Sequence, residues 1–232
     1  MNNMQISNDV KIFGGMILAT IILIIGAVFL MSRGGSQTPD NPSKQTLVPR
    51  EVLVKKDSWS IGTPSAKVTV VEFADFQCPT CKVYESILNE VKSKYKHEVL
   101  FVFRQFPLVQ AHPHAMSAAL AAQAAGNQGK FWEMASKLYD NQPTLKADGK
   151  FTDDFQQENL ISYARQMNLE MEKFTKDFDS DSALQHVLND IADGNKIGVS
   201  GTPSFFINGR QYGLNELKNS SDFSSKINPL LK

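Results

Sequence analysis

Cysteine is scarce in this sequence, because Cys78 and Cys81 are the only two among 232 residues. Two cysteines cannot build the disulfide framework of a small secreted domain, which uses several bridges to support a small core. A zinc site built on them would need two further ligands. The sequence has four histidines, and none stands in a paired zinc-finger spacing downstream of the cysteines. We therefore expect no bound metal and no cofactor.

An excess of charge of one sign is also missing. The chain carries 24 basic and 24 acidic side chains and has a formal net charge of zero. Binding to nucleic acid would need a basic patch or stripe, so no nucleic-acid partner is expected. The composition is ordinary for a globular protein and shows no low-complexity bias.

The two cysteines stand where a predicted strand meets a predicted helix. Residues 68–74 are nearly all apolar and rich in β-branched side chains, which is typical of a buried strand. Pro79 suits the first position of a helix, where its missing N–H has no cost. Apolar side chains then recur at helical spacing, at Tyr84, Ile87, Leu88, Val91 and Tyr95. A C-x-x-C pair in this setting indicates a redox-active dithiol.

The position of each cysteine predicts its role. Cys78 lies at the helix N-terminus, where unpaired N–H groups and the helix dipole favour a thiolate, so we expect it to be the nucleophile. Cys81 lies one turn into the helix and is expected to be the resolving thiol. The alternative is a buried, inert cysteine pair. Pro79 and Thr80 tune the balance between oxidant and reductant. Thr80 offers a hydroxyl group and no positive charge, so the redox potential stays open.

Three other places in the sequence are of interest for this dithiol. Glu72 interrupts the apolar strand, and a buried acid with a raised pKa could exchange a proton with Cys81. An ion pair with a lysine near the end of the sheet is the alternative. Thr202 and Pro203 precede a predicted strand at residues 204–207, which ends in a turn at residues 208–209. Residues 112–114 lead into a helix, and no catalytic or ligand-binding role is expected for them.

One long hydrophobic run occurs, at residues 12–31, bounded by Lys11 and Arg33. Its length matches the roughly 20 residues that span a bilayer core. It exceeds the apolar region of a signal peptide, about 7–15 residues, and no small-residue cleavage site follows it. We therefore predict a retained single-pass anchor, with residues 1–11 as a short cytoplasmic N-terminus.

The orientation of this anchor rests on two opposing signals. More basic residues follow the run than precede it, which taken literally opposes an outside C-terminus. The positive-inside rule weakens for long translocated domains, and disulfide chemistry favours an oxidising compartment. We therefore expect the large domain outside the cytoplasm. Residues 32–57 are predicted to be a linker with an edge strand at 51–54. Its Gly-, Ser- and Pro-rich part, residues 32 to about 45, is predicted to be a flexible tether.

The stretch between a second short strand, residues 98–103, and the strand at 204–207 is too long for a structureless loop. Its apolar side chains recur instead at helical spacing in several stripes. One of these is an Ala-rich face beginning at Ala115, and the last contains Leu184, Val187, Leu188 and Ile191. Ser180 or Ser182 is expected to cap that last helix.

The order of these motifs resembles the DsbA-like branch of the thioredoxin superfamily. The resemblance rests on Cys78-Pro79-Thr80-Cys81 between a strand and a helix, followed by a helical segment, Gly201-Thr202-Pro203 and residues 205–209. It covers residues 58–232 and looks most like the membrane-anchored thiol-disulfide oxidoreductases of Gram-positive and related bacteria. It implies an α/β thioredoxin-like fold with an α-helical insertion at about 108–197.

The resemblance also implies roles for single residues. Pro203 would be a cis proline facing the dithiol, Thr202 would bind substrate chains through its backbone, and Glu72 would be the buried acid of the family. The sequence departs from the family at Thr80, where better-known oxidases carry a histidine that stabilises the thiolate. Strong oxidising power therefore stays open.

The predicted function is that of a membrane-anchored, extracytoplasmic thiol-disulfide oxidoreductase that forms disulfides in secreted or membrane proteins. The resemblance implies a quinone-linked membrane oxidase as its reoxidising partner. A reductase with the same fold is the nearest alternative. An isomerase is disfavoured because no separate dimerisation domain precedes the fold. A non-enzymatic envelope binding or scaffold module is the alternative from another class, and the second cysteine argues against it.

Overall fold

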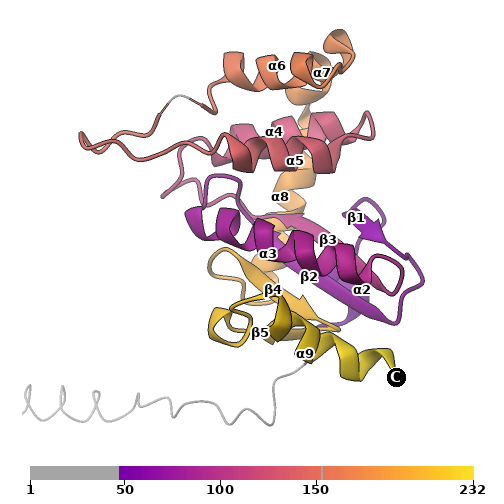
Figure 1. The fold of residues 1–232 in the computed structure, drawn as a ribbon. Helices are drawn as coiled ribbons and strands as arrows, with labels where there is room; N and C mark the ends of the chain where they lie inside the picture. The colour runs from indigo at the N-terminus through magenta and orange to yellow at the C-terminus, as the bar shows by residue number, and fades with distance from the viewer. Residues whose placement is uncertain (1–46, 153) are drawn as a thin grey trace, which may run out of the picture. The chain divides into compact units, whose positions relative to one another are not determined.

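The computed structural model describes residues 47–152 and 154–232 (Figure 1). The described residues form one compact unit by their contacts. The predicted N-terminal segment, anchor and tether, residues 1–45, lie outside the described residues and stay predictions. Within the described part of the chain, no helix combines the length and the apolar character needed to cross a membrane.

A mixed sheet is the centre of the described unit, which contains five strands in the order β1-β3-β2-β4-β5 (Figure 1). β2 and β3 pair in parallel, and the other neighbouring strands pair antiparallel. Both central strands are buried along their whole length, as expected for apolar runs in the middle of a sheet. The strands are Trp59–Gly62 (β1), Val68–Ala74 (β2), Val99–Gln105 (β3), Ser204–Ile207 (β4) and Arg210–Tyr212 (β5).

Helix α3, Pro79–Tyr95, makes the crossover that the parallel pair of β2 and β3 requires. It begins as predicted, with Cys78 as N-cap and Pro79 as the first helical residue. Together with the terminal helix α9, Ser220–Leu231, it covers one face of the sheet. The buried face of α3 consists of Cys81, Tyr84, Leu88, Val91 and Tyr95.

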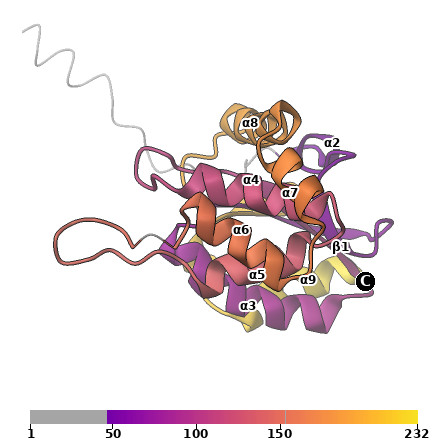
Figure 2. The ribbon, with the colours of Figure 1, turned by 90° about the horizontal axis from the view of Figure 1, so that it is seen from above.

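A helical segment lies between β3 and β4, where the apolar stripes predicted it. Helix α4 runs among the other four helices of this segment, and its alanine side chains allow them to approach closely (Figure 2). Ser180 caps α8 as predicted, because its side chain accepts a hydrogen bond from the N–H of Ala183. The helices are Ala115–Gly126 (α4), Phe131–Asp140 (α5), Gln157–Gln166 (α6), Met171–Phe178 (α7) and Asp181–Lys196 (α8).

The predicted edge strand at residues 51–54 is wrong. The chain forms a short helix there, α2, Arg50–Leu53, because Leu53 packs into the core on the second face of the sheet. The Arg50 side chain fixes this helix by donating hydrogen bonds to Thr69 Oγ1 and to the carbonyl oxygens of Pro64 and Ala66. The edge strand is instead β1, whose half-exposed Trp-Ser-Ile-Gly sequence gave no strand signal.

Helix α8 covers the same second face as α2, but only part of the predicted stripe faces it, namely the buried Val187 and the partly buried Ile191. Leu184 and Leu188 are exposed, whereas Ala183, Val187, Asp190 and Gly194 are buried. The reason is close packing, because a Cβ atom on Gly194 would lie 2.8 Å from the ring of Phe106. The helix therefore turns its small residues and one acid toward the sheet.

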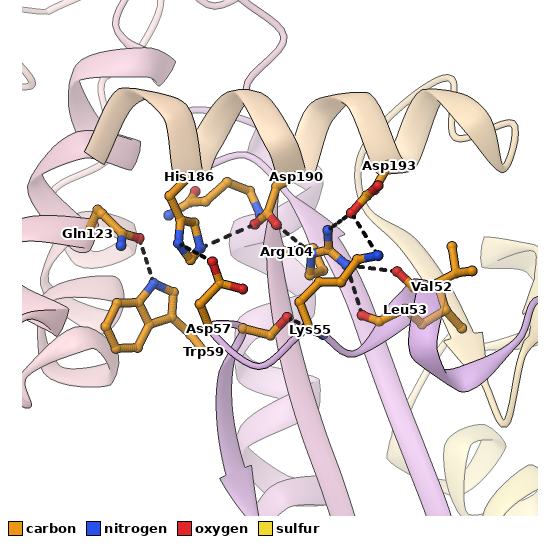
Figure 3. A network of polar contacts seen from close by, with 12 residues as sticks. Val52, Leu53, Lys55, Asp57, Trp59, Arg104, Gln123, His186, Asp190 and Asp193 are labelled. Atoms are coloured by element: carbon orange, nitrogen blue, oxygen red, sulfur yellow. Dashed lines mark hydrogen bonds and ion pairs between the residues drawn. The ribbon is translucent and has the colours of Figure 1, made fainter. Parts of the chain in front are cut away.

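The buried acid of α8, Asp190, pairs with the buried Arg104 of β3 (Figure 3). Arg104 of β3 is 0% exposed, and its Nε donates to Asp190 Oδ1 at 2.6 Å. Its Nη2 donates to Asp193 Oδ2 at 2.8 Å. Its Nη1 donates to the carbonyl oxygens of Val52 and Leu53. One guanidinium thus joins the sheet to α8 and to α2.

The last two strands form a hairpin with the predicted turn. Asn208 and Gly209 both have positive φ angles, 46° and 83°, which is the conformation that favours Asn-Gly in a two-residue hairpin. The Asn208 side chain accepts a hydrogen bond from the N–H of Thr69, so the turn is also tied to β2. A short 3₁₀ helix, Leu214–Glu216 (η2), leads from β5 toward α9.

Candidate active site

The cysteines lie at the carboxyl end of β2, where the chain turns into α3. Cys78 is 5% exposed and Cys81 is 0% exposed, and both are free thiols in the structure. The N–H of Cys78 donates to the carbonyl oxygen of Asp75 at 3.1 Å, which closes the turn before the helix. In the described part of the chain, no cluster of three or more His, Cys, Asp or Glu side chains is arranged to hold a metal ion.

The two thiols have opposite electrostatic environments. The pKa of Cys78 is lowered to about 5, first by a hydrogen bond from the Cys81 thiol and then by Thr202 and by the N–H groups of Cys81 and Thr80. Burial raises the pKa of Cys81 well above its usual value. At neutral pH, Cys78 is therefore a thiolate beside a protonated Cys81. This asymmetry fits a nucleophile with a resolving partner.

The Thr202–Pro203 peptide bond is cis, as the resemblance implied. It brings the loop before β4 against the nucleophile, where the Cys78 thiol donates to the carbonyl oxygen of Thr202 at 3.4 Å. Among the described residues, Thr202 Oγ1 is buried without a hydrogen-bond partner while Cys78 is a thiol. The Thr202 hydroxyl is thus free to donate to the thiolate, in agreement with its effect on the pKa of Cys78.

Glu72 lies on β2 and is buried, and burial raises its pKa to about 8. The charge of Lys92 opposes that rise, whereas Glu85 and Cys78 add to it. A cavity of about 10 Å³, room for about one water molecule, lies between Glu72, Lys92 and Trp132. Lys92 also lies 3.5 Å from Glu85 Oε2. A carboxyl group with a pKa near neutrality can take up and return a proton during a reaction.

Lys92 and Glu85 were missed in the sequence. Both lie on α3, where charged side chains between the apolar positions are ordinarily solvated. Their spacing gave no sign that they face a buried acid on β2. In the structure Lys92 forms an ion pair with Glu85 and acts on Glu72 through its charge, while burial raises the pKa of Glu72.

The turn that carries Cys78 is held by side chains from both sides. Asp75 accepts hydrogen bonds from the N–H groups of Gln77 and Leu108. Gln142, just after α5, donates through Nε2 to the carbonyl oxygens of Phe76 and Cys78 at 2.7 and 2.9 Å. The helical segment therefore helps to fix the backbone of the nucleophile. Gln142 offered no sequence signal, because a single glutamine in a loop is ordinary.

Replacing Glu72 with glutamine is expected to stabilise the protein at neutral pH. The pKa of Glu72 is about 8 in the fold against 4.5 for an ordinary glutamate, so the folded protein binds more protons than the unfolded chain between these values. The contribution of Glu72 to wild-type stability is therefore greatest below pH 4.5 and falls as the pH rises to about 8. The variant loses this slope and gains about 1–3 kcal/mol at about pH 7.

Denaturant unfolding of the wild type, Glu72→Gln and the exposed control Glu90→Gln across this pH range checks the expectation. Glu90 lies on the same helix as Glu85 and is exposed, so its variant should follow the wild type. Parallel stability curves for the wild type and Glu72→Gln would contradict a raised pKa at Glu72.

Comparisons with known proteins agree with this geometry. A family model described as thioredoxin matches residues 54–228. A curated relative, the Na(+)/H(+) antiporter NhaA 1 of Mycolicibacterium gilvum, is 35% identical over 153 residues, which are 65% of this chain and 23% of that protein. The chain thus spans about a quarter of the length of this relative.

Two solved structures share the fold. BdbD from Bacillus subtilis has a TM-score of 0.62 and 24% identity, over 74% of this chain and 91% of that one. The α-DsbA1 protein of Wolbachia pipientis has a TM-score of 0.63 and 21% identity, over 77% and 93% of the two chains. The family match covers the sheet, α3 and the helical segment together. The chain therefore belongs to the thioredoxin family and has the fold of its DsbA-type members.

Proposed function

We propose that the protein is a thiol-disulfide oxidoreductase that forms disulfides in secreted or membrane proteins through Cys78 and Cys81. The observation that carries this proposal is the asymmetry of the dithiol. Cys78 has a pKa of about 5, whereas the pKa of the fully buried Cys81 is raised well above its usual value. A scaffold or binding module has no need of such a pair.

In the oxidising direction, a substrate thiolate attacks Sγ of Cys78 in the Cys78–Cys81 disulfide. The S–S bond breaks, a mixed disulfide forms at Cys78, and the Cys81 sulfur takes a proton because its pKa is high. Glu72, with a pKa of about 8, supplies that proton in its protonated form. A second substrate thiolate then attacks the substrate sulfur of the mixed disulfide and releases Cys78 as a thiolate. The substrate loses two electrons, which the cysteine pair gains, and its two thiols release two protons. One of these protons restores protonated Glu72 and the other goes to solvent, so the pair ends as a Cys78 thiolate and a protonated Cys81.

The low pKa of Cys78 favours oxidation over reduction of substrates. A stabilised thiolate stabilises the reduced dithiol, so the disulfide form becomes a stronger oxidant, by about 30 mV for each pKa unit. Thr80, at the position where the family oxidases carry a histidine, supplies its backbone N–H to the thiolate, and Thr202 of the cis-proline loop supplies a hydroxyl. This is why we favour an oxidase over a reductase of the same fold.

We further propose that residues 12–31 anchor the protein in the cell membrane, with the catalytic domain outside the cytoplasm. The proposal is supported by the length of the uncharged run and by a dithiol suited to an oxidising compartment. Continued turnover needs an oxidant for the reduced dithiol, and a quinone-linked membrane oxidase is the expected partner. In intact cells first treated with a reductant that cannot cross membranes, a thiol reagent that cannot cross them either should label Cys78. Labelling only after lysis would contradict this location.

A direct assay of the function uses the full chain with its disulfide formed and a reduced, unfolded test protein. We expect one disulfide in the test protein for each Cys78–Cys81 disulfide consumed. The reverse assay, reduction of insulin by the dithiol form, distinguishes a reductase. If neither reaction exceeds the rate without protein, the enzyme proposal fails and a binding module is favoured.

A further inference from the structure

A buried carboxylate lies three residues before the nucleophile. Asp75 is 1% exposed and belongs to the turn between β2 and α3. Its Oδ1 accepts from the N–H of Gln77 at 2.7 Å, and its Oδ2 accepts from the N–H of Leu108 at 2.8 Å. These bonds join the active-site turn to the loop that follows β3. A buried anion at this place has a cost, because it would oppose a second negative charge on Cys78.

The counter-charge comes from His112, in the same loop as Leu108. His112 Nδ1 lies 2.7 Å from Asp75 Oδ2, and the imidazole side chain is 14% exposed. The loop is held in place, because the N–H of His112 donates to the carbonyl oxygen of Leu108. The N–H of His114 donates to Gln77 Oε1 in the active-site turn. These two backbone hydrogen bonds, at residues 112 and 114, hold the loop so that the His112 imidazole stays against the Asp75 carboxylate.

Two titratable groups interact with the imidazole in the described part of the chain. The hydrogen bond with Asp75 raises the pKa of His112, and the charges of Asp75 and Cys78 raise it further. Asp75 reaches His112 from the turn after β2, and Cys78 reaches it from the first turn of α3. Both favour the imidazolium form. The loop before α4 was expected to have no part in the chemistry, yet it places a histidine against a buried acid side chain, within range of the charge of the nucleophile.

We propose that the His112 imidazolium is a positioning residue that neutralises the buried Asp75 carboxylate beside the Cys78 thiolate. This inference rests on the proposed thiol-disulfide exchange and adds a charge relation to it. The carboxylate orders the turn through two N–H groups, and the imidazolium prevents it from destabilising the thiolate. A histidine outside the C-x-x-C motif thereby influences the dithiol, although the two residues between the cysteines, Pro79 and Thr80, include no histidine.

The experiment is a double-mutant cycle on the full chain with His112→Ala and Asp75→Asn. The readout is the pH titration of the Cys78 thiolate by its ultraviolet absorbance. His112→Ala leaves the Asp75 side chain without its cationic partner and should raise the pKa of Cys78 by about one unit. The dithiol should become about tenfold less oxidising, which is about 30 mV. The double variant Asp75→Asn/His112→Ala, which removes both opposite charges together, should have a Cys78 pKa close to that of the wild type.

His114→Gln is the matched control, because His114 contacts the active-site turn through its backbone N–H. Its Cys78 pKa should equal that of the wild type. An unchanged Cys78 pKa in folded His112→Ala, or a double variant whose Cys78 pKa is raised as far as in His112→Ala, would overturn the inference. If Asp75→Asn does not fold, His112→Ala against His114→Gln decides alone. Failure of the proposed function is seen separately, as a wild type without exchange activity.

Discussion

Replacing Cys81 with alanine is expected to turn the protein into a covalent trap for its substrates. Cys78 keeps its partial exposure and can still form a mixed disulfide. The thiol that would resolve this bond from within the protein is then missing. Turnover in the oxidation assay should fall to the rate without protein, because the variant cannot form the internal disulfide that accepts electrons from the substrate.

Expression of Cys81→Ala in the native envelope, followed by electrophoresis with and without a reducing agent, measures the adducts. Cys78→Ala is the matched control. The remaining Cys81 is 0% exposed and its pKa is well above its usual value, so that variant should form no adducts. Equal adducts from the two variants would contradict the assignment of Cys78 as the nucleophile.

Replacing Arg104 with methionine is expected to produce the largest loss of stability. The guanidinium is fully buried and bonds to two carboxylates and two carbonyl oxygens (Figure 3). Removing it leaves Asp190, which is also buried, without its cationic partner. Breaking a buried pair in this way costs about 3–5 kcal/mol of unfolding free energy. Burial already raises the pKa of Asp190, so the loss should be smaller in acid, where this carboxylate is protonated.

Denaturant unfolding of Arg104→Met and Lys55→Ala tests this prediction. Lys55 contacts the same Asp193 at 3.4 Å, but its side chain is 36% exposed. An exposed pair contributes at most about 1 kcal/mol. The two variants therefore remove cations from one cluster at different depths. Equal, small losses would contradict a structural role for the buried arginine.

The centre of the fold could be predicted because its signals are local. The apolar run of β2, the Pro79 that starts α3 and the Asn-Gly turn after β4 each lie within a few residues. Backbone preferences and hydrophobic periodicity act over that range. The same local signals place Cys78 at a helix N-terminus. The position of the two cysteines, which form the centre of the site, could therefore be predicted from the sequence.

Other features depend on partners that are distant in the sequence. Arg104 pairs with Asp190, 86 residues later, and Asp75 pairs with His112, 37 residues later. Nothing near either residue shows that its charge is buried. The exposed Leu184 and Leu188 have the same origin, because the close approach at Gly194 decides which face of α8 is buried. Pairings of this kind can be identified only when the fold is known.

The short elements at the N-terminal side of the sheet were the hardest to assign. Residues 51–54 have an apolar pattern that suits a strand, yet Arg50 and Leu53 make contacts that hold this stretch as a helix. β1 contains a serine and a glycine and lies at the edge of the sheet. Its side chains therefore do not alternate between buried and exposed, and its sequence shows no strand-like hydrophobic pattern. Its pairing with β3 is decided by contacts of the backbone, which the side-chain pattern does not report.

The most direct measurement for the whole account is a redox titration of the Cys78–Cys81 pair in the full chain against glutathione. A Cys78 pKa of about 5 lies between those of thioredoxin, about 7, and DsbA, about 3.5. The potential should therefore fall between their values of about −270 and −120 mV, close to −200 mV. A single two-electron transition there is the predicted result. A potential at or below about −270 mV, or no reversible transition, would contradict the account.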